Sequence, residues 1–254
     1  MSELRFSEPK HFLNMHKKLE FAIKDYNMIE ENDHVLAAMS GGKDSTVMLK
    51  LLARKKVMTT NNFKLSALFV RQGFDNDDKK IEFLGNYCEN LKVPFFVTDA
   101  LVSEAFETRK EGPCYICSRM RRLAIFNFAD TLGIRVISFG HHKDDFIETF
   151  FMNILQNGDV STIKPNNLFF EGKYRVIRPM LYIDEQKIIN EAKDLPKFSS
   201  GCPYECNSER SVVKKLLKEL YAKNRQTRSN IFRSMFSVKE EYMLKEPSCL
   251  SILR

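Results

Sequence analysis

The chain has 254 residues, of which 43% are hydrophobic and 29% are charged, and its formal net charge is +7. This length suffices for one α/β domain of ordinary size with a modest appendage, and its core needs no disulfide staples. The sequence begins Met-Ser-Glu-Leu-Arg without an apolar run of signal length, and no stretch approaches a membrane span. We therefore expect a cytosolic protein rather than a secreted or membrane-spanning one.

Apolar strands alternate with helical patterns along most of the chain, which is typical of a parallel sheet covered on both faces. Strands are predicted at 34–39, 66–71, 94–97 and 135–140. Helices are predicted at about 11–28, 44–55, 77–92, 118–132, 143–156 and 185–193. Residues 167–178 indicate a small hairpin, and the chain from Ser208 to Phe236 is helical. We predict a doubly wound α/β sheet over 31–200, preceded by an N-terminal helix within 1–30 and followed by a helical region over 201–254.

The first motif is the turn at residues 40–45, Ser-Gly-Gly-Lys-Asp-Ser, between a predicted strand and a predicted helix. Two glycines let backbone N–H groups approach an anion closely, and the following helix directs its positive dipole end at the same point. The turn is not a Walker loop, because Ala37 occupies the first glycine position and Asp44 follows the lysine. It is not a Gly-x-Gly-x-x-Gly turn either. The pattern predicts a phosphate site for a nucleotide.

The second motif is a pair of cysteines, Cys114 and Cys117, with Cys202 and Cys206 much later in the chain. In a cytosolic protein these are not structural disulfides. They are compatible with a redox dithiol, a four-cysteine zinc site, or an iron–sulfur cluster held by three cysteines with one iron open. The other two cysteines are interpreted as a buried apolar residue and a bystander, Cys88 and Cys249.

The third motif is the run at 140–145, Gly-His-His-Lys-Asp-Asp, where a predicted strand ends and a predicted helix begins. Ligands of open α/β sheets bind at this edge. The paired carboxylates Asp144 and Asp145 are suited to hold magnesium or to act as a base, and an aspartate at this position also caps a helix.

Basic residues gather in two places. Ten lysines or arginines and four glutamates lie between Asn207 and Lys245, and Arg119, Arg121 and Arg122 cluster beside Cys117. Lysine-rich composition also occurs on ordinary solvated surfaces. A helical surface with this excess of positive charge favours a nucleic-acid partner.

The motifs in this order resemble the tRNA 2-thiocytidine synthetase family, whose phosphate turn is the PP-loop of the ATP pyrophosphatases. The resemblance spans about residues 15–235. The segments that carry it are 22–31, 40–45, 71–74, 114–122, 140–145 and 176–179.

The resemblance implies a PP-loop ATP pyrophosphatase fold and a homodimeric enzyme that uses ATP and Mg²⁺ to adenylate the C2 oxygen of a tRNA cytidine. Sulfur from a donor, either a cysteine desulfurase or free sulfide, then reaches the base through a [4Fe-4S] cluster. The implied ATP site comprises Ser40, Gly41, Gly42, Asp44, Ser45 and Gly140, with Lys43 near the phosphates or positioning the loop. The implied cluster ligands are Cys114, Cys117 and Cys202. Asp145, with Asp144 as the alternative, is implied to position magnesium or activate the base.

One departure leaves the modified base open. Three residues separate Cys202 from Cys206, and the phrase Cys202-Pro203-Tyr204 is closer to the 2-thiouridine synthetases. A uridine enzyme is therefore one alternative. A PP-loop ligase or an RNA-binding protein with a structural zinc site is the alternative from another class.

Overall fold

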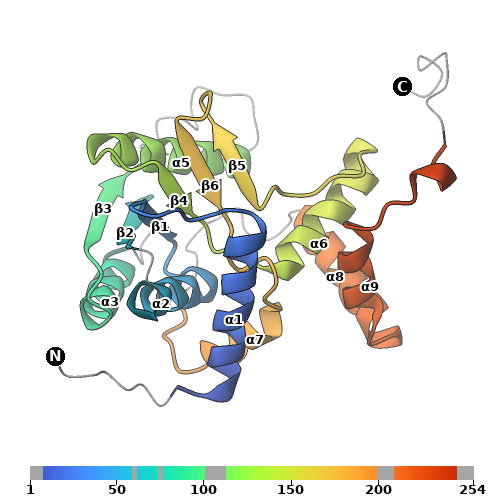
Figure 1. Ribbon diagram of the computed structural model, residues 1–254, viewed down its shortest axis with the longest axis horizontal. Helices are drawn as coiled ribbons and strands as arrows, with labels where there is room; N and C mark the ends of the chain where they lie inside the picture. The colour runs from blue at the N-terminus through green and yellow to red at the C-terminus, as the bar shows by residue number, and fades with distance from the viewer. Residues whose placement is uncertain (1–7, 59–61, 74–76, 101–112, 199–208, 245–254) are drawn as a thin grey trace.

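The computed structural model describes residues 8–58, 62–73, 77–100, 113–198 and 209–244. Its centre is a six-stranded sheet in the order β3-β2-β1-β4-β6-β5 (Figure 1). The strands are β1 His34–Met39, β2 Lys64–Arg71, β3 Phe95–Asp99, β4 Val136–Ser138, β5 Asn166–Phe169 and β6 Tyr174–Ile177. In this sheet β5 is antiparallel to its neighbour and the other pairs are parallel. The strand order reverses between β1 and β4, which marks the switch point where such sheets bind ligands.

Strand β1 is buried on both faces, which explains its uninterrupted apolar run. Leu36 and Ala38 face one hydrophobic cluster, whereas Val35, Ala37 and Met39 face the other. This alternation follows from the two-residue period of a strand. Each neighbour of β1 is held in a defined register, so the ends of β1 and β4 meet at one edge of the sheet.

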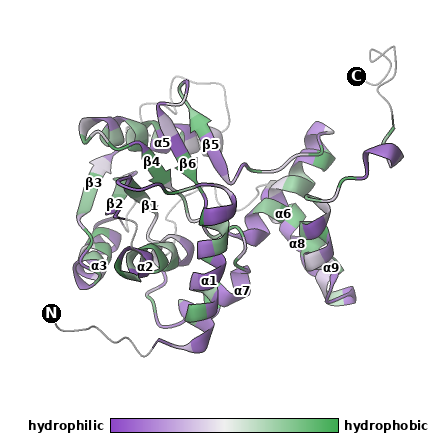
Figure 2. Ribbon diagram, in the orientation of Figure 1, coloured by the Kyte–Doolittle hydropathy of each residue, from purple (hydrophilic) through white to green (hydrophobic). Residues whose placement is uncertain are grey.

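Helices cover both faces of the sheet (Figure 1). One cluster joins the sheet to α1 Lys10–Asp25, α2 Lys43–Met58, α3 Asp77–Asn90 and α7 Glu185–Glu191. The other cluster joins it to α5 Pro113–Thr131. Figure 2 shows the strands as mainly hydrophobic and the helices as mixed, with hydrophilic turns toward the outside. None of the described helices has both the length and the apolar character needed to cross a membrane.

A smaller helical unit lies beside the sheet (Figure 1). It consists of α6 Lys143–Met152, a π-helical turn at Asn153–Asn157, α8 Glu209–Lys223 and α9 Thr227–Ser234, and a short 3₁₀ turn, Glu240–Tyr242, follows it. Ile147 on α6 and Val213 and Leu217 on α8 form its buried centre. Because α6 begins directly after β4, this unit is anchored at the carboxyl edge of the sheet.

The predicted strands and helices and the doubly wound α/β class are confirmed. The segment at 167–178 forms a hairpin, as predicted, but it is not a separate insertion, because β6 also pairs in parallel with β4. The hairpin turn contains Phe170, Glu171 and Gly172, each with positive φ. The sequence pattern identifies this local turn but cannot show which strand β6 will join.

Candidate active site

The phosphate turn at 40–45 is held by hydroxyl groups from the first turn of α2. The Ser45 Oγ accepts a hydrogen bond from the Ser40 backbone at 3.1 Å and donates to the Gly42 carbonyl at 3.0 Å. Thr46 Oγ1 donates to the same carbonyl at 3.0 Å. Gly41 has φ +77°, and a Cβ there would lie 3.0 Å from Cγ of Lys80. The turn therefore requires glycine and leaves the N-terminus of α2 open to an anion.

A second glycine brings β4 against this helix start. A Cβ on Gly140 would lie 3.0 Å from the backbone nitrogen of Ser45 and 3.1 Å from the carbonyl carbon of Asp44. Both atoms are backbone and cannot rotate away. A cradle of N–H groups with this backbone approach suits a phosphate. The structure thus brings Gly140, which the resemblance implies for the ATP site, against the turn.

The side chain of Lys43 points to the start of α7. Its ammonium donates to both carboxylate oxygens of Asp44 and to Oε1 of Glu185, each at 3.0 Å. Burial alone would lower the pKa of Lys43, but the two carboxylates outweigh burial and raise it. Lys43 thus remains a cation and links the phosphate turn to α7. This placement favours a role in positioning the loop.

The two predicted carboxylates at the start of α6 have different surroundings. Asp144 is buried, and its oxygens accept from the Glu185 backbone at 2.8 Å and lie 3.1 Å from Nε of Arg228. Asp145 accepts from the backbone of His142 at 2.8 Å and lies 3.6 Å from Arg210. Burial opposes the charge on Asp145, but the two neighbouring histidines and the backbone bond lower its pKa. Asp144 thus joins α6 to α7 and α9, whereas Asp145 caps the start of α6 and lies beside Arg210 of α8.

Helices α8 and α9 bring two arginines, Arg210 and Arg228, to the carboxylates of α6, where the sequence analysis did not place them. Glu148 is buried, with Arg210 Nε at 3.1 Å and Lys214 Nζ at 3.5 Å. Burial raises the pKa of Glu148 to about 7. Glu148 follows Asp144 and Asp145 by about one helical turn, so the sequence spacing predicts that all three lie on one face of α6. Nothing in the sequence pattern pointed to Arg228. We refer to Asp144, Asp145, Glu148, Arg210 and Arg228 as the charged cluster.

Cys117 lies at the same edge of the sheet. The amide Nε2 of Gln72, which directly follows β2, is 2.8 Å from its Sγ. Burial lowers the pKa of the nearby Arg121, and the Cys117 sulfur acts in the opposite direction. Cys114 lies one turn earlier in α5, where the backbone alone is described, and Cys202 and Cys206 lie outside the described residues.

Within the described segments, no group of three or more His, Cys, Asp or Glu side chains is arranged around a metal position. Of the three predicted cluster ligands, Cys117 has its side chain among the described residues. The distances between the three sulfur atoms therefore lie outside the described part of the chain. Magnesium needs fewer protein ligands, because it commonly uses one or two carboxylates together with substrate phosphates. Asp145 fits that requirement.

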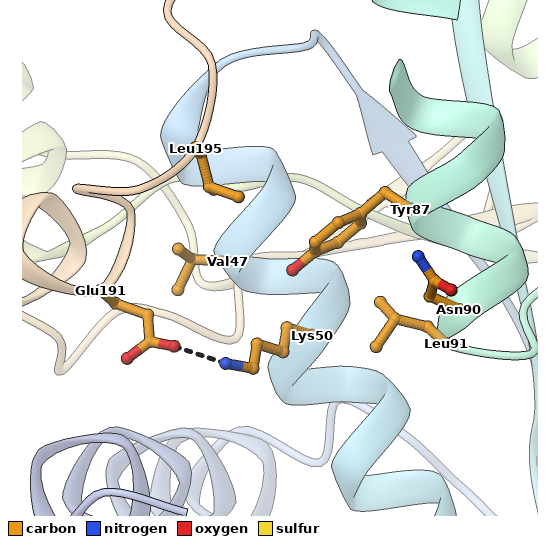
Figure 3. Close-up of a pocket in the computed structure, with 7 residues that line it drawn as sticks. All are labelled: Val47, Lys50, Tyr87, Asn90, Leu91, Glu191 and Leu195. Atoms are coloured by element: carbon orange, nitrogen blue, oxygen red, sulfur yellow. Dashed lines mark hydrogen bonds and ion pairs between the residues drawn. The ribbon is translucent and has the colours of Figure 1, made fainter. Parts of the chain in front are cut away.

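Two cavities flank α2. One of about 320 Å³ opens at the phosphate turn and is lined by Gly41, Gly42, Thr46 and the ring of Phe83. A second of about 200 Å³ lies farther along the helix (Figure 3). There Lys50 reaches across to Glu191, with Nζ 2.6 Å from Oε1. The rest of its lining is mainly apolar. The contact between Lys50 and Glu191 therefore holds α7 against α2. Of the two cavities, the first is the one that opens at the phosphate turn.

The doubly wound sheet, the glycine turn between β1 and α2 and the backbone approach of β4 define a PP-loop nucleotide-binding protein. A family model of the PP-loop domain, ATP_bind_3, matches residues 13–198. The chain is 32% identical to a tRNA-cytidine(32) 2-sulfurtransferase of Pseudomonas fluorescens, over 94% of this chain and 88% of that one. A protein of the same name from Nitrosospira multiformis is 31% identical, with coverage of 95% and 84%. The chain belongs to the PP-loop family of the tRNA-cytidine(32) 2-sulfurtransferases.

A solved structure supports the fold assignment. The U34-tRNA thiolase NcsA from Methanococcus maripaludis, determined with its [4Fe-4S] cluster, superposes with a TM-score of 0.75 and 23% identity. The match covers 94% of this chain and 82% of that one. The similarity includes the C-terminal helices as well as the sheet, because it extends over nearly the whole chain.

Proposed function

We propose that this protein is an ATP-dependent tRNA 2-thiolase that converts a cytidine to 2-thiocytidine. The observation that carries the proposal is the position of Cys117. Its sulfur lies beside Gln72 at the end of β2, on the edge of the sheet where β1 ends in the phosphate turn. An adenylation site and a sulfur ligand on one edge are what thiolation of a base requires. The similarity to tRNA-cytidine(32) 2-sulfurtransferases supports the same reaction and favours cytidine over uridine.

The first chemical step is adenylation of the base. The C2 oxygen of cytidine attacks the α-phosphorus of ATP, the bond to the bridging oxygen breaks, and pyrophosphate leaves. Backbone N–H groups at residues 40–45 and the dipole of α2 stabilise the developing negative charge. Asp145 would hold Mg²⁺ on the phosphates, and Lys43 keeps the loop against α7.

The second step replaces the activated oxygen by sulfur, and AMP is the leaving group. Cys114, Cys117 and Cys202 would hold the [4Fe-4S] cluster, which supplies the sulfur when it is bound. The chemistry of this donor set suits the group, since thiolates are the usual ligands of such clusters. The Gln72 amide donates a hydrogen bond to the Cys117 sulfur and so fixes its position at the end of β2.

The remaining assignments extend this proposal. The C-terminal region over 201–254, through its helices α8 and α9, contacts tRNA, with Arg119, Arg121 and Arg122 as further phosphate contacts. The enzyme acts in the cytoplasm as a homodimer and receives sulfur from a cysteine desulfurase or from free sulfide. The base is reached in an unpaired loop, where it does not have to be extracted from a duplex.

Nucleoside mass spectrometry of tRNA from a deletion strain tests the function. Wild-type complementation should restore 2-thiocytidine, whereas Cys117→Ser should restore none and should still form AMP from ATP in the presence of tRNA. Cys88→Ala is the matched control, because Cys88 is fully buried in the core and burial raises its pKa to about 12. Restoration of 2-thiouridine would identify the uridine alternative. Thiolation by Cys117→Ser, or a colourless zinc protein after anaerobic purification, would contradict the proposal.

A further inference from the structure

A groove between α1 and α9 carries lysines and aromatic rings that adenylation does not use. Its volume is about 530 Å³, and its lining includes Asn14, Lys17, Phe21, Lys143, Tyr182 and Phe232. Phe21 is 49% exposed, and Lys17 Nζ lies 5.7 Å from the centre of its ring. Because about half of the Phe21 side chain is exposed, its ring is accessible to a ligand.

The outer face of α1 presents a continuous stripe. Its exposed members recur every three or four residues and are Lys10, Asn14, Lys17, Phe21 and Lys24. The opposite face of the helix is buried in the main core. The helix is about 24 Å long, so the stripe extends over several nucleotides of a single strand.

The aromatic side of the groove combines Tyr182, which lies between β6 and α7, with Phe232 of α9. Tyr182 and Phe232 meet edge to face at 6.2 Å, and Phe232 and Phe236 meet at 5.2 Å. Phe236 is 54% exposed. The ammonium of Lys143 lies 5.1 Å from the centre of the Phe232 ring. The groove thus combines ring faces with cations, as surfaces that bind unpaired nucleic acid do.

The groove lies beside the start of α6, which carries the active-site carboxylates. Lys143 directly precedes Asp144, and it shares the carboxylate of Asp184 with Lys18, at 3.1 and 3.2 Å. Asp184 is followed by Glu185, which binds Lys43 of the phosphate turn. The groove also contains the carboxylate of Asp25, and its three lysines, Lys17, Lys18 and Lys143, outnumber Asp25 and Asp184, so positive charge remains for a phosphate. When one nucleotide of an RNA strand occupies the active site, the nucleotides next to it in that strand therefore reach this groove.

We propose that the groove binds the unpaired tRNA strand that flanks the modified nucleotide, with a base stacked on Phe21 and phosphates on Lys17 and Lys143. The inference rests on the proposed function, which supplies the tRNA. Bases of an unpaired loop expose their faces to aromatic side chains, whereas paired bases do not. Lysines neutralise phosphates without reading sequence.

Fluorescence anisotropy with a labelled anticodon stem-loop tests the inference on the full-length protein. Phe21→Ala should weaken binding about ten-fold, Phe21→Trp should retain it, and a fully paired RNA should not respond to either change. Lys17→Ala should weaken binding and reduce the slope of log affinity against log salt by about 0.7. Phe170→Ala and Lys56→Ala are matched controls, because both residues are exposed far from the groove. None of these variants should change the basal hydrolysis of ATP.

The outcomes separate the two proposals. If wild type forms 2-thiocytidine and binds the stem-loop while Phe21→Ala and Lys17→Ala bind within two-fold of it, the groove assignment is wrong and the proposed function stands. If the same variants change the mass in solution by light scattering, the groove belongs to a second copy of the chain and the assignment is also wrong. If wild type forms no thionucleoside, the proposed function fails, and a ten-fold effect of Phe21→Ala would still support the groove.

Discussion

The phosphate turn and the charged cluster lie side by side at the carboxyl edge of the sheet, but they are assembled differently. The turn is braced within a few residues, by hydroxyls of Ser45 and Thr46 on the backbone of Ser40 and Gly42. In the charged cluster, carboxylates of α6 meet guanidinium groups from α8 and α9. Local backbone geometry therefore forms the first, and tertiary packing forms the second.

This difference shows which part of the site depends on the C-terminal helices. Neutral hydrogen bonds such as those of the turn are each worth about 1 kcal/mol. A buried charge that loses its partner costs more, because it stays desolvated. Docking of α8 and α9 through Val213 and Leu217 is thus coupled to the state of the active-site carboxylates. The nucleotide cradle has no such dependence.

The largest expected effect comes from filling the approach between β4 and α2. Gly140→Ala introduces a Cβ about 3 Å from backbone atoms of Ser45 and Asp44, so the start of α2 must shift. We expect AMP formation to fall by more than about 100-fold, because small misplacements of reacting groups cost that much. Gly85→Ala is the control, since its nearest neighbour is 3.9 Å away. Equal activity of both variants would show that the cradle tolerates displacement.

The two aspartates of α6 should differ in their effect on turnover. Asp144→Asn should lower the free energy of unfolding by about 1–3 kcal/mol, because it weakens the contacts with Arg228 and α7. Asp145→Asn should lower this free energy by about 0.5–2 kcal/mol, because Asp145 caps α6, and, unlike Asp144→Asn, it should lower adenylation by about 30-fold through the loss of a charged metal ligand. Thermal unfolding and pyrophosphate release measure the two effects. An interchange of these outcomes would reverse the roles that we assign.

Glu148 should impose a pH dependence on stability. Its pKa is raised from 4.5 to about 7 in the folded state, so the native protein holds more protons than the unfolded chain between these values. This contribution is present at low pH and is lost as pH rises toward and through 7. In Glu148→Gln, we expect this fall to diminish by about 1–2 kcal/mol between pH 5 and 8. Urea unfolding across this range measures it, and an unchanged profile would show that Glu148 is ionised throughout.

The smallest expected effect lies within the turn. Ser45→Ala removes the bonds to Ser40 and Gly42, and we expect a loss of about 1 kcal/mol in stability and about five-fold weaker ATP binding. Ser237→Ala, at an exposed site beyond α9, should change neither quantity. Calorimetric titration with ATP provides the measurement. A larger effect on stability than that of Asp144→Asn would contradict the distinction between the turn and the charged cluster.

Most of the fold was predictable from the sequence because the strands of a covered sheet are continuous apolar runs and the helices have their own period. The turn at 40–45 was also predictable, since its glycines and hydroxyls act on near neighbours. The pairing of β6 with β4 was not, because nothing local to Tyr174–Ile177 specifies a partner strand. The link from Lys43 to Glu185 and the position of Arg228 likewise depend on helices distant in the chain.

The sequence by itself determined the class of fold, the phosphate turn and the nature of the groups available for chemistry, because these depend on residue type and short spacing. Tertiary structure alone decided that Asp144 contacts α7 and Arg228 while Asp145 lies beside Arg210, and that Cys117 meets Gln72 at the end of β2. It also decided that α1 and α9 enclose one groove. The physical reason is that burial and partner charge set the behaviour of these side chains, and both arise only when distant elements pack together.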